Sequence, residues 1–228
     1  MKRLIPINII LVLFLTVSLG ASIKTIQELQ EENSLINISR EVLHLDLLEA
    51  NKKLVKKEQQ ISSLRENAAK LASVSSLSNY FSEEEIEQLV SEIPTGSPFP
   101  GGYIVTAPYG KSVGYNGSYR NDHEGIDLGP ADGDWQIHPY SAGIVTDYDE
   151  DHVYGKYLYV QHTDRVRSFY AHAAKIFYRA TTGNNVELST TMMIMGETGQ
   201  ADGPHLHFEI QILTADGWKK IDPTPFLE

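Results

Sequence analysis

A stretch of 56 residues without glycine or proline, residues 23–78, constrains the fold of this chain more than any other feature. It is rich in Leu, Glu, Lys and Gln, which favour helix. With Ile26 at heptad position a and Leu29 at position d, eleven of the fourteen a and d positions up to Leu71 are apolar. Apolar heptads sustained over this length predict a coiled coil rather than a single solvated helix.

Three polar residues, Asn33, Arg40 and Lys57, interrupt the apolar seam. Polar seam residues can fix the register of a coiled coil at a cost in stability. The heptads favour packing between chains, as a homo-oligomer or with another protein of the cell envelope. A helix that folds back within its own chain, or onto the domain that follows, is the alternative.

Residues 1–20 are predicted to be a signal peptide or a membrane anchor. Lys2 and Arg3 precede an apolar run, and the small residues Ser18 and Gly20 suit cleavage by signal peptidase. The apolar core is short for a spanning helix, which needs about 20 residues. We expect cleavage, with a retained membrane anchor as the alternative. Both interpretations predict export, to the periplasm or the cell envelope.

Residues 79–102 are predicted to form a short helix and a linker. Ser82 and Glu85 have the spacing of a capping box at the start of a helix over residues 83–93, which Pro94 ends. From residue 103 to residue 228, short runs rich in Val, Ile, Tyr and Phe alternate with Gly, Asn and Asp clusters. This pattern predicts an antiparallel β domain, so the fold class is mainly β, preceded by a long α-helical coiled coil. The clearest strands are expected at 143–148, 157–162, 168–172, 192–195 and 205–212.

The charge balance and the absence of cysteine exclude several classes of function and of site. The net charge is −11, and from residue 95 onward 9 Lys and Arg stand against 17 Asp and Glu. Nucleic-acid binding would call for a basic surface, so no nucleic-acid partner is expected. Without cysteine the chain has no disulfide and no thiolate ligand for zinc.

Two short stretches, His123 to Asp127 and His205 to His207, together have the composition of a zinc site. Zinc readily binds imidazole and carboxylate, and three protein ligands leave a position open for water. Residues two apart on a strand share a face, so His205 and His207 can both face one site. Four residues of straight strand would place His123 and Asp127 about 13 Å apart, so the chain must bend between them. Gly125 is the residue that most easily allows that bend.

The motifs around these residues resemble the LytM/lysostaphin-type zinc metallopeptidases, which cleave peptide bonds in bacterial peptidoglycan. The resemblance runs in the expected order from about residue 98 to the C-terminus. The matching motifs are A-P-Y-G at 107–110, H-E-G-I-D-L at 123–128, S-A-G-I-V at 141–145, Y-A-H at 170–172, G-E-T-G at 196–199 and G-P-H-L-H-F-E at 203–209. Residues 131–140 and 188–191 depart from the family pattern, which bears on the walls of the groove and on substrate preference.

The resemblance implies that His123, Asp127 and His207 bind Zn²⁺ and that His172 and His205 are catalytic. A neutral imidazole can take a proton from an attacking water, and an imidazolium can donate to a developing oxyanion. No H-E-x-x-H motif is present, so no glutamate base is expected from that pattern. The sequence leaves open which of His172 and His205 is the base.

Three neighbouring features carry weaker expectations. Tyr170 lies two residues before His172, so on a strand the two share a face, and Tyr170 either lines the groove or packs as a structural tyrosine. His162 is expected to support a hairpin. The glycine-rich segment 196–204 is expected to form a mobile rim of the site.

We therefore expect an exported zinc metalloendopeptidase that hydrolyses peptide bonds in peptidoglycan stems or cross-bridges. The alternative is a non-catalytic regulator with a LytM-like domain, which activates other cell-wall hydrolases. Regulators of this kind lack some ligands, whereas this chain lacks none of them. A structural zinc site is a weaker interpretation, because structural sites usually have four protein ligands.

Overall fold

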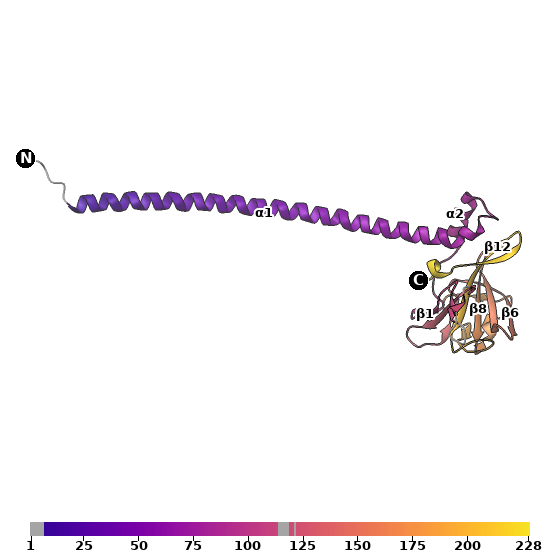
Figure 1. Cartoon of the computed structure of the whole chain (residues 1–228). Coiled ribbons are helices and arrows are strands. Elements are labelled where there is room, and N and C mark those ends of the chain that lie inside the picture. Colours follow the sequence, from indigo (N-terminus) through magenta and orange to yellow (C-terminus); the bar gives the residue numbers. More distant parts are fainter. Residues whose placement is uncertain (1–6, 114–118, 121) are drawn as a thin grey trace, which may run out of the picture. The chain divides into compact units, whose positions relative to one another are not determined.

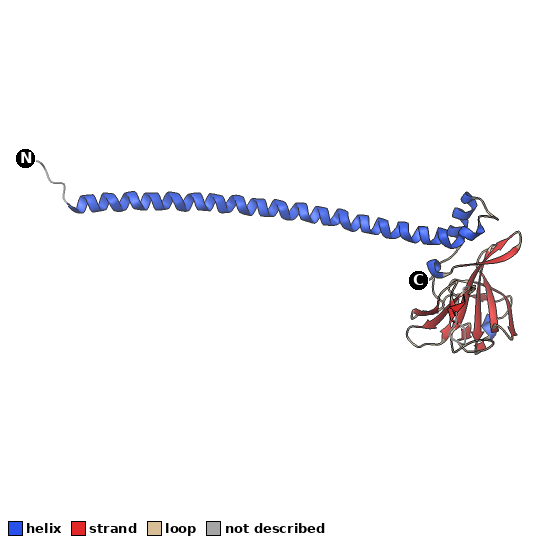
Figure 2. Cartoon of the chain, in the orientation of Figure 1, coloured by secondary structure: helices blue, strands red, loops and turns tan. Residues whose placement is uncertain are grey.

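The computed structural model describes residues 7–113, 119–120 and 122–228, and the chain divides into two units, Met1–Ser63 and Leu64–Glu228. The positively charged start of the predicted targeting segment, Lys2 and Arg3, lies outside the described residues. Helix α1 (Ile7–Val74) begins well before the predicted coil, and a 3-10 turn, Ser75–Leu77, follows it. The described part of the first unit is helical throughout (Figure 1, Figure 2). Within the described residues, no helix combines the length and the apolar character that crossing a membrane requires.

The heptad seam of α1 is exposed in the single chain. Ile26, Leu47 and Leu54 have 54%, 57% and 55% of their surface accessible. A helix gains most of its stability in a protein from packing of an apolar face, and α1 buries little of that face by itself. The association of this seam with another helix therefore stays a prediction.

The short second helix, α2 (Glu83–Glu92), starts with the predicted capping box. The Ser82 hydroxyl accepts a hydrogen bond from the Glu85 N–H, and the Glu85 carboxylate accepts one from the Ser82 N–H at 2.8 Å. Ile86 and Leu89 are buried in the hydrophobic core of the second unit, together with Val74 and Leu77. The end of α1 and the apolar face of α2 thus contribute to the core of the β domain.

An antiparallel sheet of eight strands forms the second unit, in the order β1-β4-β12-β8-β7-β6-β10, with β13 also paired to β12. This confirms the predicted antiparallel β domain after a long helix. The strands are β1 (Tyr103–Ala107), β4 (Ile126–Pro130), β6 (Gly143–Asp151), β7 (Gly155–Gln161), β8 (Val166–Ala173), β10 (Asn185–Val186), β12 (Leu206–Thr214) and β13 (Gly217–Ile221). A second sheet has the strand order β5 (Gln136–Ile137), β11 (Met193–Ile194), β9 (Lys175–Ile176). A third sheet pairs β2 (Ser112–Val113) with β3 (Tyr119–Arg120). The remaining 3-10 turns are Tyr178–Ala180 and Thr224–Phe226.

The two faces of the large sheet differ in chemistry, as the alternation along β12 shows. Leu206, Phe208 and Ile210 are fully buried in the core. Their neighbours His207 and Glu209 point to the opposite face, because successive side chains of a strand alternate. An antiparallel sheet can keep one face packed and leave the other for solvent and chemistry.

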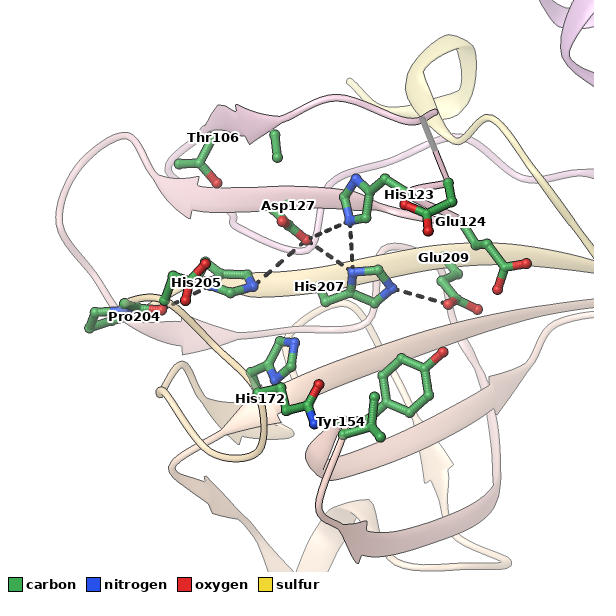
Figure 3. A pocket seen from close by; sticks show the side chains of 16 residues that line it. Thr106, His123, Glu124, Asp127, Tyr154, His172, Pro204, His205, His207 and Glu209 are labelled. Carbon is green, nitrogen blue, oxygen red and sulfur yellow. Dashed lines mark hydrogen bonds and ion pairs between the residues drawn. The ribbon is translucent and has the colours of Figure 1, made fainter. Parts of the chain in front are cut away.

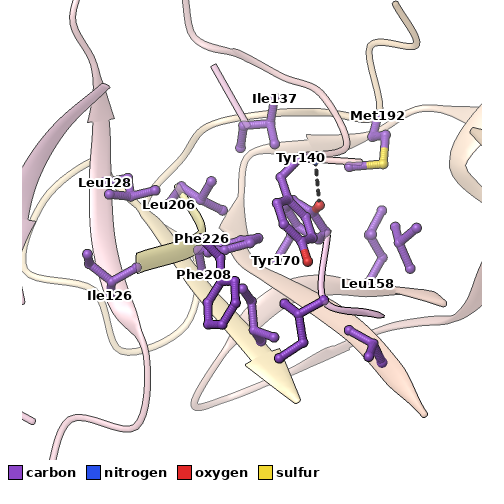
Figure 4. Close-up of a cluster of buried hydrophobic side chains, with 14 of the residues drawn as sticks. Ile126, Leu128, Ile137, Tyr140, Leu158, Tyr170, Met192, Leu206, Phe208 and Phe226 are labelled. Atoms are coloured by element: carbon purple, nitrogen blue, oxygen red, sulfur yellow. Dashed lines mark hydrogen bonds between the residues drawn. The ribbon is translucent and has the colours of Figure 1, made fainter. Parts of the chain in front are cut away.

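Tyr170 lies on the core face, so the interpretation that it lines a groove is wrong. It is fully buried, and its hydroxyl accepts hydrogen bonds from the Tyr140 N–H at 3.0 Å and from the Ser168 hydroxyl at 3.1 Å (Figure 4). A tyrosine buried with a satisfied hydroxyl contributes packing rather than a surface for ligand.

His162 follows β7 and supports the hairpin, in agreement with its predicted role. Its Nδ1 lies 2.9 Å from the Ala142 carbonyl oxygen and its Nε2 lies 2.7 Å from the Ser168 hydroxyl. Burial lowers the pKa of His162 to about 4, although the hydrogen bond to Ala142 opposes the shift. The folded protein therefore keeps this imidazole neutral at a pH at which the unfolded chain protonates it.

Because of His162, the free energy of unfolding is expected to decrease as the pH is lowered. Between the unfolded pKa near 6.5 and the folded pKa near 4 the unfolded state binds the extra proton, so acidification destabilises the fold, by up to about 3 kcal/mol. Denaturant titrations at about pH 7.5 and about pH 5 measure the effect. His162→Gln should lose less stability over this interval than wild type, and His152→Gln, at an exposed position, should lose as much as wild type. Equal losses in His162→Gln and wild type would contradict the assignment.

Candidate metal centre and groove

His123, Asp127 and His207 meet on the open face of the sheet, where β4 and β12 lie side by side (Figure 3). His207 is the cross-strand partner of Asp127. The Nε2 atom of His123 lies 3.1 Å from Oδ1 of Asp127 and 3.1 Å from Nδ1 of His207. The third side of this triangle, Nδ1 of His207 to Oδ1 of Asp127, measures 2.9 Å. The structure thus brings together all three predicted ligands.

The outer nitrogens of both imidazoles are held by acceptors. Nδ1 of His123 lies 3.0 Å from the Pro108 carbonyl oxygen, and Nε2 of His207 lies 3.0 Å from Oε1 of Glu209. A carbonyl oxygen and a carboxylate only accept, so in the neutral rings these outer nitrogens keep the proton. The lone pairs of both rings then point inward, at Asp127 and at each other.

This donor set fits a zinc ion. Zinc binds imidazole nitrogen and carboxylate oxygen at about 2.0–2.2 Å in tetrahedral geometry, which places ligand atoms about 3.3 Å apart. The three atoms of the triangle are within a few tenths of an ångström of that separation. Outer hydrogen bonds that fix the tautomer of each histidine are typical of metal ligands.

Gly125 makes room for this arrangement. The chain bends at Gly125, as predicted, before β4 begins. A Cβ atom there would lie 2.6 Å from Cε1 and 2.7 Å from Nε2 of His207, and 2.7 Å from the Phe208 carbonyl oxygen. The glycine is therefore required by the close approach of β12 as much as by the bend.

His172 reaches the same face through an unusual backbone conformation. It is the one non-glycine residue of the described chain with a left-handed φ, at 63°. Strict alternation after Tyr170 would turn His172 toward the core, and the left-handed conformation at the end of β8 turns it toward His207 instead. Non-glycine residues held in this region cluster at functional sites.

The two predicted catalytic histidines face each other beside the metal-ligand triangle. Their ring centroids are 4.7 Å apart, and Nε2 of His205 lies 3.7 Å from Oδ1 of Asp127. Nδ1 of His172 donates to the Thr198 carbonyl oxygen at 2.8 Å, and Nδ1 of His205 to that of Gly203 at 2.8 Å. In both rings Nδ1 is thus occupied by a carbonyl acceptor, and Nε2 is the atom that can exchange a proton with a bound molecule.

The electrostatics of the site separate the histidines into two kinds. Burial lowers the pKa of His172 to about 4, so this ring is neutral at neutral pH. Burial works against the charged forms of Asp127 and His207, but hydrogen bonds outweigh it. Those from His123 and His207 hold the pKa of Asp127 well below its usual range, and those to Asp127 and Glu209 raise the pKa of His207 to about 9. A metal at the triangle would compete with protons for these atoms, so its binding is expected to weaken in acid.

A groove of about 580 Å³ opens over the triangle. Its walls come from β1, the segment before β4, the β6–β7 turn and the loop before β12. Besides the three triangle residues, His172 and His205, the groove is lined by Thr106, Ala107, Asp122, Glu124, Val153, Tyr154, Gln200, Asp202, Gly203, Pro204 and Glu209. The described residues at 131–140 and 188–191 are not among those that line it.

Glu209, Lys220 and the wall residue Tyr154 were not identified from the sequence. Glu209 had a signal, because it continues the alternation of His205 and His207 along one face of a strand. Lys220 had none, since only the pairing of β13 with β12 brings it to the site. The Thr198 hydroxyl, which donates to the Ala173 carbonyl oxygen at 2.9 Å, ties the predicted rim to the end of β8.

Residues 121–223 match the family model described as Peptidase family M23, so the chain carries a domain of this family. DD-carboxypeptidase/endopeptidase Mpg of Neisseria meningitidis is 29% identical over 90 residues, which are 40% of this chain and 20% of the relative. Peptidoglycan DD-endopeptidase ShyC of Vibrio cholerae is 30% identical over 70 residues, 31% of this chain and 16% of the relative. The aligned segments thus span a fifth or less of these relatives. The catalytic domain of the prophage-encoded M23 protein EnpA from Enterococcus faecalis superposes with a TM-score of 0.46 at 23% identity, covering 57% of this chain and 95% of that one.

We expect the purified protein to bind one zinc ion per chain, and His123→Ala, Asp127→Ala and His207→Ala each to lose it. Each substitution removes one of only three protein ligands. Metal analysis after dialysis measures the content, and His152→Ala, at an exposed position, is the matched control that should keep its zinc. Near-stoichiometric zinc in the three ligand variants would refute the assignment.

Proposed function

We propose that this chain is a zinc-dependent endopeptidase that hydrolyses peptide bonds in the stems or cross-bridges of bacterial peptidoglycan. The observation that carries the proposal is the triangle of His123, Asp127 and His207 with both catalytic histidines beside it in an open groove. Three protein ligands leave a zinc ion free to meet a substrate, whereas a structural site usually has four.

The chain's own residues divide the work. When bound, zinc supplies a Lewis acid that polarises the scissile carbonyl and makes water acidic enough to attack near neutral pH. His123, Asp127 and His207 would hold it, in the orientation fixed by Pro108 and Glu209. The groove would bind the peptide and limit the access of bulk water to the reacting atoms.

His172 and His205 are proposed to move the protons. Nδ1 of His172 donates to the Thr198 carbonyl oxygen, which leaves Nε2 of the neutral ring as the acceptor that a general base needs. In its imidazolium form His205 would keep Nδ1–H on the Gly203 carbonyl oxygen and donate from Nε2, which lies 3.7 Å from Oδ1 of Asp127, to charge that develops on the substrate oxygen. The hydrogen bonds of the two rings support this proposed division of roles.

The substrate class is inferred from the family. The two relatives are named for DD-carboxypeptidase or endopeptidase activity, and one of them for peptidoglycan. Residues 121–223 match the family model, and the motifs at 123–128 and 203–209 within them supply imidazole and carboxylate ligands. Peptide stems or cross-bridges of peptidoglycan are therefore the substrates that we propose.

The proposed surroundings are the periplasm or the cell envelope, reached through an N-terminal targeting segment. Support comes from the basic residues and the apolar run at the start of the sequence. The exposed seam of α1 supports association with another helix, as a homo-oligomer or with a protein of the envelope.

Peptide-bond cleavage in purified sacculi tests the enzyme against the regulator. The zinc-loaded protein should release peptide fragments and leave glycan bonds intact, a chelator should stop it, and zinc should restore it. His172→Ala should keep its zinc and lose about 10²–10⁴-fold in rate, because a general acid–base group contributes that much. Mass analysis of the products measures both.

The regulator would be the correct interpretation if the zinc-loaded wild-type protein releases no peptide from sacculi of several wall types, yet stimulates a separate hydrolase. Wild-type turnover in zinc-loaded His172→Ala would instead contradict the role of His172.

Light scattering on two truncated chains tests the association. Residues 21–228 should form a dimer or a higher oligomer, and residues 64–228 should be monomeric, because the exposed seam is then mostly removed. The truncation must not extend past residue 64 by much, since Val74 and Leu77 are buried in the core of the β domain. A monomeric longer chain would contradict packing between chains.

A further inference from the structure

A buried carboxylate lies directly behind the ligand His207. Glu209 is completely inaccessible to solvent, and both of its oxygens are used. Oε1 accepts from Nε2 of His207 at 3.0 Å, and Oε2 accepts from the Gln211 side-chain amide at 2.5 Å. An ionised carboxylate in such a place is costly unless an opposite charge and hydrogen bonds compensate it.

Lys220 supplies the opposite charge from the neighbouring strand. Its Nζ lies 2.9 Å from Oε1 of Glu209, the same oxygen that holds His207. The pairing of Gln211 with Lys220 places this side chain on the open face of the sheet, next to Glu209. Only 24% of the Lys220 side chain is exposed, so the ion pair is largely shielded from solvent.

The same ammonium group reaches the wall of the groove. Nζ of Lys220 also lies 2.7 Å from Oε2 of Glu124 and 3.3 Å from the Tyr154 hydroxyl. Glu124 follows the ligand His123 in the chain, and the Tyr154 ring lies 5.9 Å from the ring of His207. Lys220 thus contacts both Glu209, which holds the ligand His207, and two residues that line the groove, Glu124 and Tyr154.

We propose that Lys220 is a positioning residue of the metal centre: it compensates Glu209 and fixes Oε1 on Nε2 of His207, so that Nδ1 of His207 stays aimed at the metal. The inference rests on the proposed zinc centre. Without Lys220, Glu209 is left as an uncompensated carboxylate and moves away from His207 or recruits water. His207 then loses the acceptor that sets its tautomer and ring orientation, which is how such outer partners govern metal affinity.

A purely structural ion pair would behave differently. Its loss would lower the free energy of unfolding and leave the zinc affinity of the folded protein unchanged. A positioning role changes zinc affinity in molecules that remain folded. The affinity of the folded full-length protein for zinc is therefore the measurement that separates the two roles.

The test compares Lys220→Met with Lys219→Met by competition against a chromophoric chelator, using zinc itself as the probe. Methionine keeps the length of the side chain and removes its charge. Lys219 is the matched control, because it is next on β13 but turns to the other face, 5.4 Å over the Tyr80 ring. Lys220→Met should bind zinc about 10–100-fold more weakly than wild type, and Lys219→Met as tightly as wild type.

Circular dichroism of the zinc-free proteins establishes that the compared variants are folded. Should Lys220→Met not fold, Lys220→Gln decides, since its amide can still donate to Glu209 but carries no charge, and its affinity should also fall. Wild-type zinc affinity in the folded variant would overturn the inference and leave the proposed function standing. A wild-type protein that binds no zinc would overturn the proposed function itself.

Discussion

The register of β12 against β4 and β8 is the constraint on which the rest of the molecule depends. It sets His207 opposite Asp127 on one side and opposite Ala171 on the other. A slip of one residue would exchange the two faces of β12, burying His207 and exposing Phe208. The packing of the apolar side chains of β12 on the core face therefore fixes the register, and the register fixes where its polar side chains lie on the open face.

Two backbone adjustments refine what the register provides. At Gly125 the absence of a side chain lets the His207 ring approach the bend before β4. At His172 the left-handed backbone departs from the alternation of β8 and brings a core-facing position to the open face. Both adjustments lie at the site, and departures from regular backbone conformation are expected at functional sites. The His172 backbone costs conformational energy that its surroundings must supply, and the hydrogen bonds from its N–H to the Tyr154 carbonyl oxygen and from its ring to Thr198 are part of that support.

The sequence predicts features that depend on local pattern and misses those that depend on distant pairing. Helix formation, the Ser82 capping box and the antiparallel β domain follow from composition and spacing over short windows. The grouping of the ligand residues follows from motif order. The side-chain direction of Tyr170 was open because alternation put it on the face of His172, and one dihedral angle reverses that relation. Nothing in the local sequence marks Lys220, because β13 is short and half-exposed. Only the pairing of β13 with β12 brings Lys220 next to the site.

The helical end that enters the β domain bears on how the site is reached. Ile86 and Leu89 of α2 belong to the same hydrophobic core as Leu206 and Phe208, which lie on the core face of β12. The ion pair of Glu92 with Arg165, at 2.9 Å, adds a polar contact at the same end of the domain. Because the side chains of the metal triangle project from the opposite face of that strand, α2 stabilises the sheet without covering the groove.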